Sequence, residues 1–86
     1  MDLSGRHRAT LRAIFADPVR ASIVWTDVEA LFRAAGAEMT EGQGSRVRVA
    51  LGGVRAVFHR PHPEKETDRG AVRSVRRFLK EAGIEP

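Results

Sequence analysis

The stretch from Arg46 to His59 constrains the fold more than any other part of this chain, because it has the pattern of a β-hairpin with a fixed register. Residues 46–51 alternate polar and apolar side chains, Gly52-Gly53 follows, and a second alternating run covers residues 54–59. Such alternation is typical of a half-buried strand. Two adjacent glycines suit the tight hairpin turns that need positive φ at both positions. Counting outward from them pairs Leu51 with Val54 and Arg46 with His59.

This register predicts one apolar face and one cationic face, because opposed residues of an antiparallel pair lie on the same side of a sheet. The apolar face, which we expect to meet the core, comprises Val47, Val49, Leu51, Val54, Ala56 and Phe58. The other face displays Arg46, Arg48, Arg55 and His59. No acidic residue occurs between Gly42 and Pro63, so the hairpin carries a local positive field.

A group of arginines beside a histidine suits a phosphodiester. Guanidinium groups match phosphate oxygens with paired hydrogen bonds, and an imidazole can transfer a proton near neutral pH. The residues predicted to contact a phosphodiester backbone are Arg46, Arg48, Arg55, His59, Arg60, His62, Lys65, Arg73 and Arg76. The alternative is that the arginines of the strands are only the polar residues that an open sheet needs on its solvent-exposed side. Those of the last helix would then form an ordinary solvent-exposed helix face.

Capping and spacing predict three helices around this hairpin. Ser4 can cap a first helix that runs to about Ala16. Thr26 and Glu29 form a capping box for a second helix, which Gly36 ends. A short strand is expected at 37–40, and Thr67 or Asp68 starts a last helix that ends at Gly83. The apolar positions of the last helix are Val72, Val75, Phe78, Leu79 and Ala82.

The predicted order is helix, helix, three strands and helix, which is an α+β domain with helices covering the apolar face of an antiparallel sheet. Trp25 and the phenylalanines fall at apolar positions, so we expect them in the core. A chain of 86 residues supports a single core. We therefore predict a two-layer α+β domain.

Composition limits the chemistry and the location. The chain has no cysteine, and His59 and His62 lack a third ligand at a recognisable spacing, so no metal site or cofactor is expected. The polar opening MDLSGRHRAT differs from a secretory signal, and no apolar run reaches the roughly 20 residues of a membrane span. We expect a soluble, cytoplasmic protein. Its thirteen arginines and two lysines give a formal net charge of +4.

Several of these features, in order, resemble the HicA toxin family. The resemblance covers roughly Trp25 to Ile84 and includes Gly44-Ser45 before a strand, a hairpin, the stretch Pro61 to Glu66, and a closing Ala82-Gly83-Ile84. It implies a fold like the double-stranded RNA-binding domain, with the order α-β-β-β-α. Residues 1–24 would then be an N-terminal helical extension and residues 25–86 the HicA-like domain.

The resemblance also implies a function and a partner. Members are toxins of bacterial toxin–antitoxin pairs that cleave or block messenger RNA without a metal, and a HicB-type antitoxin neutralises them. They carry a histidine directly after the Gly-Ser step, where this chain has Arg46 and Val47. His59, opposite Arg46 in the predicted register, is our candidate for the catalytic proton transfer, with Arg46 stabilising charge on the phosphate.

Three functions stay open at this level. The chain is a HicA-like toxin and endoribonuclease, a catalytically inactive RNA-binding module of the same fold, or a protein-interaction domain whose basic face docks an acidic antitoxin.

Overall fold

A computed structural model describes residues 3–86 and contains three helices and one three-stranded sheet. The elements in chain order are α1 (Gly5–Ile14), α2 (Trp25–Ala34), β1 (Glu38–Glu41), β2 (Arg46–Leu51), β3 (Val54–His59) and α3 (Arg69–Glu81). The predicted α+β class and the order α-β-β-β-α after an extra helix are confirmed.

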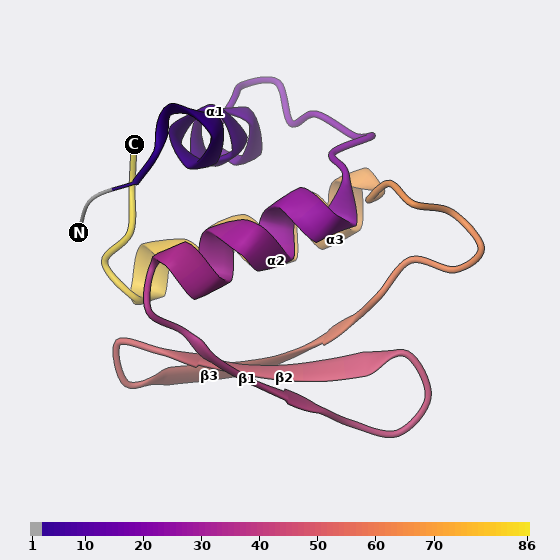
Figure 1. Ribbon diagram of the computed structural model, residues 1–86. Coiled ribbons are helices and arrows are strands. Elements are labelled where there is room, and N and C mark those ends of the chain that lie inside the picture. Colours follow the sequence, from indigo (N-terminus) through magenta and orange to yellow (C-terminus); the bar gives the residue numbers. More distant parts are fainter. Residues whose placement is uncertain (1–2) are drawn as a thin grey trace.

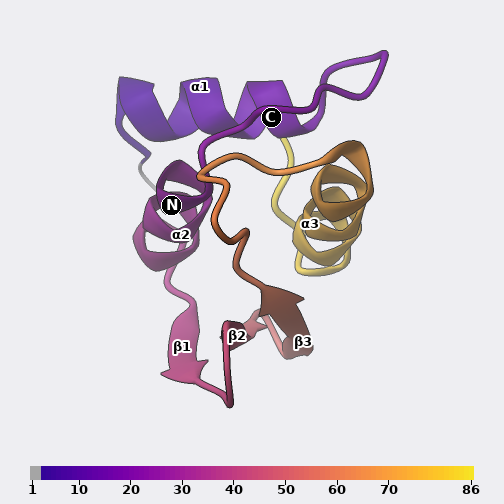
Figure 2. The same ribbon diagram turned by 90° about the vertical axis from the view of Figure 1, so that its right-hand side faces the viewer.

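The elements form layers, with the sheet on one side (Figures 1 and 2). α2 and α3 lie side by side over one face of the sheet, and α1 crosses both helices on their far side. The extra helix therefore adds a third layer to the predicted pair. No element of residues 3–86 covers the opposite face of the sheet, which we call the outer face.

The sheet has the order β1-β2-β3, and both strand pairs are antiparallel. The predicted hairpin register is confirmed at every position, from Leu51 opposite Val54 to Arg46 opposite His59. Gly52 and Gly53 have φ values of 56° and 80°, as the tight hairpin turn requires. The first strand covers residues 38–41, one residue later than predicted.

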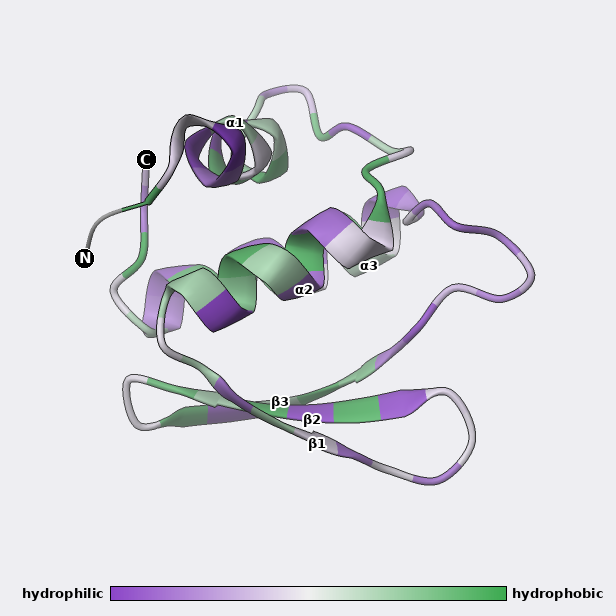
Figure 3. Cartoon of the chain, in the orientation of Figure 1, coloured by the Kyte–Doolittle hydropathy of each residue, from purple (hydrophilic) through white to green (hydrophobic). Residues whose placement is uncertain are grey.

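The core lies between the sheet and the helices, as the alternating hydropathy of β2 in Figure 3 illustrates. Val47 and Val49 of β2 are each 1% exposed. Phe32, Phe58 and Phe78 come from α2, β3 and α3, and their ring centroids are 5.5–5.6 Å apart. Trp25 is also buried, whereas Phe15 is only partly buried against this cluster, so the core assignment is confirmed for Trp25 and three of the four phenylalanines. Leu11 and Ile14 bring α1 into the same cluster.

The start of α2 differs from the prediction. The helix begins at Trp25 with Val24 as its N-cap and without a side-chain cap, so the capping box of Thr26 and Glu29 is wrong. The backbone N–H of Trp25 instead donates to the carbonyl of Lys65 at 2.9 Å, which fixes the entry to the helix through a tertiary contact. The Glu29 carboxylate is thus left for other partners.

The other helix ends follow the expected rules. Ser4 accepts a hydrogen bond from the backbone of His7 at 3.3 Å and caps α1, which ends two residues before the predicted Ala16. Of the two candidates for the N-cap of α3, Asp68 is the one observed, and it accepts from Ala71 at 2.7 Å. Gly36 and Gly83 both have positive φ after their helices.

Candidate nucleic-acid interface

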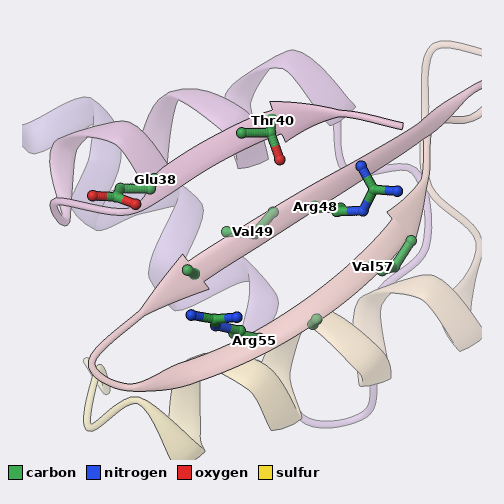
Figure 4. Close-up of a pocket in the computed structure, with 8 residues that line it drawn as sticks. Glu38, Thr40, Arg48, Val49, Arg55 and Val57 are labelled. Atoms are coloured by element: carbon green, nitrogen blue, oxygen red, sulfur yellow. The ribbon is translucent and has the colours of Figure 1, made fainter. Parts of the chain in front are cut away.

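The outer face of the sheet is organised as three cross-strand rows. The strand pairings set Glu38, Ala50 and Arg55 side by side in the first row. The second row is Thr40, Arg48 and Val57. The third row, at the other end of the sheet, holds Arg46 and His59. The first two rows are visible in Figure 4, which looks onto the sheet with helices behind it.

Two hollows follow these rows along the outer face. The first has a volume of about 550 Å³ and is lined by polar groups that include Glu38, Arg48 and Arg55, over small apolar side chains. The second has a volume of about 380 Å³ and lies between the turn at Gly42-Gln43 and the pair Arg46 and His59. Arg48 and Val57 line both hollows. The outer face therefore offers one continuous, concave surface.

A tight turn between β1 and β2 shapes the second hollow. The N–H of Gly42 donates to the carbonyl of Arg46 at 2.9 Å. A Cβ on Gly42 would lie only 3.1 Å from the Cβ of Arg46, so a side chain there would crowd it. The N–H of Arg60 donates to the carbonyl of Ser45 at 2.8 Å, which ties the end of β3 to this turn. These bonds hold Arg46 and His59 at one end of the sheet.

Arg60, predicted to bind RNA, faces the helices instead. Its Nε donates to Glu29 of α2 at 2.6 Å, and its Nη1 lies 2.5 Å from the carboxylate of Glu41. The hydrogen bonds that Arg60 donates to these two carboxylates raise its pKa further above its ordinary value. The guanidinium is therefore committed to a structural ion-pair cluster.

The predicted basic residues of α3 lie behind the sheet, so the structure does not bring them together with the outer face. Arg73 is exposed on the helical layer. Arg76, predicted to contact RNA or to lie on a solvated helix face, has a side chain that is only 21% exposed. Its guanidinium donates to the carbonyls of Ile14 and Ala16 at 2.8 and 2.7 Å. The reason is the crossing of α1 over α3, which the periodicity of α3 alone does not reveal.

The remaining predicted residues, His62 and Lys65, lie exposed in the loop between β3 and α3. This loop begins directly after the end of β3 that carries His59.

Among the described residues, no group of three histidine or carboxylate side chains is arranged to hold a metal ion. None of the helices in residues 3–86 combines the length and apolar character needed to cross a bilayer.

Sequence reasoning missed Glu38 and Thr40, which β1 adds to the outer face. The turn between β1 and β2 is longer than the Gly52-Gly53 turn, so counting from it does not fix the register. The alternation of Glu38, Met39 and Thr40 was the available signal, with only Met39 on the core side.

The family model described as the HicA toxin of bacterial toxin–antitoxin pairs matches residues 25–84. The chain belongs to the HicA toxin family. A HicA-family chain is a toxin of a toxin–antitoxin pair, and membership implies an antitoxin partner of the HicB type. Neither the curated proteins nor the solved structures contain a match to it. The matched segment begins at Trp25, the first residue of α2, so α1 lies outside it.

Proposed function

We propose that this HicA-family protein binds messenger RNA on the outer face of its sheet and cleaves it without a metal ion, in the cytoplasm. The observation that carries the proposal is the convergence of Arg46, Arg48, Arg55 and His59 on one uncovered, concave sheet face. Arginine forks and an imidazole are the groups that phosphodiester chemistry needs.

The second hollow is the proposed place of the reacting phosphate. Arg46 and Arg48 both line it, and both side chains are exposed and able to donate to phosphate oxygens. Arg48 has a hydrogen bond of 3.3 Å from its Nη1 to the carbonyl of Glu41, which steadies the guanidinium beside the hollow. An exposed guanidinium pair at this position would hold an RNA backbone in register on the sheet.

His59 is the proposed general base. It would remove the proton from a ribose 2′-hydroxyl, whose oxygen attacks the adjacent phosphorus while the bond from phosphorus to the 5′-oxygen breaks. The products are a 2′,3′-cyclic phosphate and a 5′-hydroxyl, which receives its proton from water or from His62. Arg46, directly across the strand pair, would stabilise the extra negative charge on the phosphate in the transition state.

The loop after β3 supports the same assignment. Lys65 and His62 lie exposed in this loop, which leaves the sheet directly after His59, so we propose that they contact the RNA beyond the cleaved bond. The proposal does not include Arg60, Arg73 and Arg76. Arg60 forms an ion pair with Glu29, and the other two belong to α3 on the far side of the core from the outer face.

The test is RNA cleavage in the presence of a chelator by the wild type and by His59→Ala. We expect the variant to lose at least about 100-fold in cleavage rate, since general base catalysis contributes on that order, while RNA affinity changes little. His7→Gln, on α1, is the matched control and should retain the wild-type rate. Undiminished cleavage by His59→Ala would contradict the assignment of His59.

Two other outcomes would replace the proposal. RNA binding without cleavage by the wild type would identify a catalytically inactive RNA-binding module. Failure to bind RNA even at low salt would leave the outer face as the docking surface for an acidic antitoxin.

A further inference from the structure

The first row of the outer face contains a hollow that the proposed cleavage chemistry does not use. We infer that the space between Glu38 and Arg55, over Ala50, is a subsite for a guanine base. This inference rests on the proposed function and adds base specificity to it. It concerns the end of the sheet away from His59.

The geometry leaves room for a flat ring at this position. Glu38, Ala50 and Arg55 are neighbours across three adjacent strands, so the two outer residues are separated by about 10 Å of backbone. Between them stands only the methyl group of Ala50. Glu38 and Arg55 form no ion pair with each other in the described structure, whose salt bridges involve other carboxylates. Figure 4 shows both side chains at the rim of the same hollow.

Glu38 supplies the acceptors for one edge of the base. An ionised carboxylate only accepts hydrogen bonds and has two oxygens to do so. Guanine is the RNA base whose Watson–Crick edge presents two adjacent donors, N1–H and the 2-amino group. Adenine, cytosine and uracil each place an acceptor beside their donor, which a carboxylate oxygen would repel. The carboxylate therefore favours guanine.

Arg55 supplies donors for the other edge. A guanidinium forms a paired contact with the O6 and N7 acceptors of guanine, which is the commonest base-specific contact of arginine. Ala50 and the exposed Val57 offer an apolar floor against which the ring can lie. A carboxylate on one side and a guanidinium on the other thus match the two edges that distinguish guanine.

The charge of Glu38 supports a base rather than a phosphate at this row. Of the side chains on the three rows, only Glu38 is acidic. A carboxylate beside the RNA backbone would repel phosphate and weaken binding, whereas a carboxylate facing a base edge contributes hydrogen bonds. Two strand repeats separate this row from Arg46 and His59, about 13 Å along the strand. The guanine would therefore lie a few nucleotides from the cleaved bond.

The experiment measures the affinity of the wild type for short 2′-O-methyl oligouridines, which lack the nucleophile for cleavage. Each carries one central guanine, adenine, hypoxanthine or 7-deazaguanine. We expect the guanine strand to bind roughly 10-fold more tightly than the adenine strand, the scale of one good paired contact. Hypoxanthine, which lacks the 2-amino group, and 7-deazaguanine, which lacks N7, should each lose most of this advantage.

Two variants test which side chain contacts which edge of the guanine. In Glu38→Gln the guanine and hypoxanthine strands should bind equally, and in Arg55→Met the guanine and 7-deazaguanine strands should bind equally. Glu81→Gln, the same charge change on α3, should keep the wild-type preferences. The strand series itself requires no variant, so the inference stays testable if Glu38→Gln fails to fold.

The outcomes separate the inference from the function on which it rests. Salt-sensitive binding of all strands with equal affinity would overturn the guanine subsite and leave the RNA-binding surface intact. Absence of binding to every strand at low salt would overturn both.

Discussion

Glu29 connects more groups at the His59 end of the sheet than any other carboxylate in the described structure. It accepts hydrogen bonds from Arg60 at 2.6 Å, from Arg33 at 3.3 Å and from the indole N–H of Trp25. Its side chain is only 9% exposed. A carboxylate buried this deeply stabilises the fold only if its lone pairs are satisfied, and here three donors satisfy them. Arg60 thereby joins α2 to the residue that follows His59.

This cluster predicts a specific pH dependence of stability. Burial raises the pKa of Glu29, but the hydrogen bonds from Arg60 and Trp25 and the nearby positive charges lower it more, so it lies below its ordinary value of 4.5. A carboxyl with a lower pKa in the folded state stabilises the fold above its unfolded pKa. That stabilisation is lost as the pH falls through the folded pKa. We expect the free energy of unfolding to decrease as the pH drops below 4.5.

Urea unfolding, followed through the fluorescence of Trp25 at a series of pH values, measures this dependence. Glu29→Gln should show a shallower decrease below pH 4.5 than the wild type, because it removes the carboxyl that titrates. Glu81→Gln, an exposed acid on α3, should follow the wild-type curve. An unchanged slope in Glu29→Gln would contradict the role of the cluster.

Strand parity could have placed Arg60 correctly from sequence. Phe58 faces the core, so residue 60, two positions further, falls on the same side of the strand direction. Its partners could not be predicted in the same way. The sequence pattern assigned Glu29 to a helix cap, whereas its contacts depend on where α2, β1 and the end of β3 meet in space.

Among the elements, α1 packs on the core through Leu11 and Ile14, and its C-terminal end is bound by Arg76 of α3. The guanidinium of Arg76 donates to two carbonyls at the end of α1, lies 3.3 Å from the Asp17 carboxylate, and stacks over Phe15 at 5.8 Å from the ring centroid. The free carbonyls at a helix C-terminus need such donors. Arg76 thus serves as a C-terminal cap supplied by a different helix.

Replacing Arg76 with methionine should therefore destabilise the fold by about 2 kcal/mol, the loss of charged hydrogen bonds to otherwise unpaired carbonyls. Arg77→Met, one position along the same helix but exposed, should change stability by less than about 0.5 kcal/mol. Chemical denaturation of the two variants measures both values. Equal stabilities would show that the contacts of Arg76 contribute little.

Local patterns predicted the elements better than their docking. The hairpin was predictable residue by residue, because the glycine turn and the alternation of residues 46–59 together fix register and face. No local rule of this kind predicts the crossing of α1 over α3. Because Arg76 contacts the end of α1, its position could not be predicted either. For the rows of the outer face, the sequence predicts the residues that β2 and β3 contribute, but not Glu38 and Thr40 of β1.

At the scale of the whole molecule, the sheet separates two cationic regions. Arg46, Arg48 and Arg55 lie on the outer face, whereas Arg73 and Arg77 lie on the helical layer on the other side of the core. A short RNA bound on the outer face would not reach the arginines of α3. We also propose that residues 1–24, of which the first two lie outside the described residues, form an extension to the domain at residues 25–86. Its described part contributes Leu11, Ile14 and Ile23 to the core.

This separation leads to the most direct test of the proposed interface, which is the salt dependence of RNA affinity in single arginine variants. Each phosphate contact that is removed should lower the slope of log affinity against log salt by about 1. We predict that Arg48→Ala weakens RNA binding and reduces the slope in this way, while Arg73→Ala, of equal charge change, leaves both close to the wild type. A reduced slope in Arg73→Ala together with an unchanged slope in Arg48→Ala would contradict the account, because it would move the RNA from the sheet to the helices.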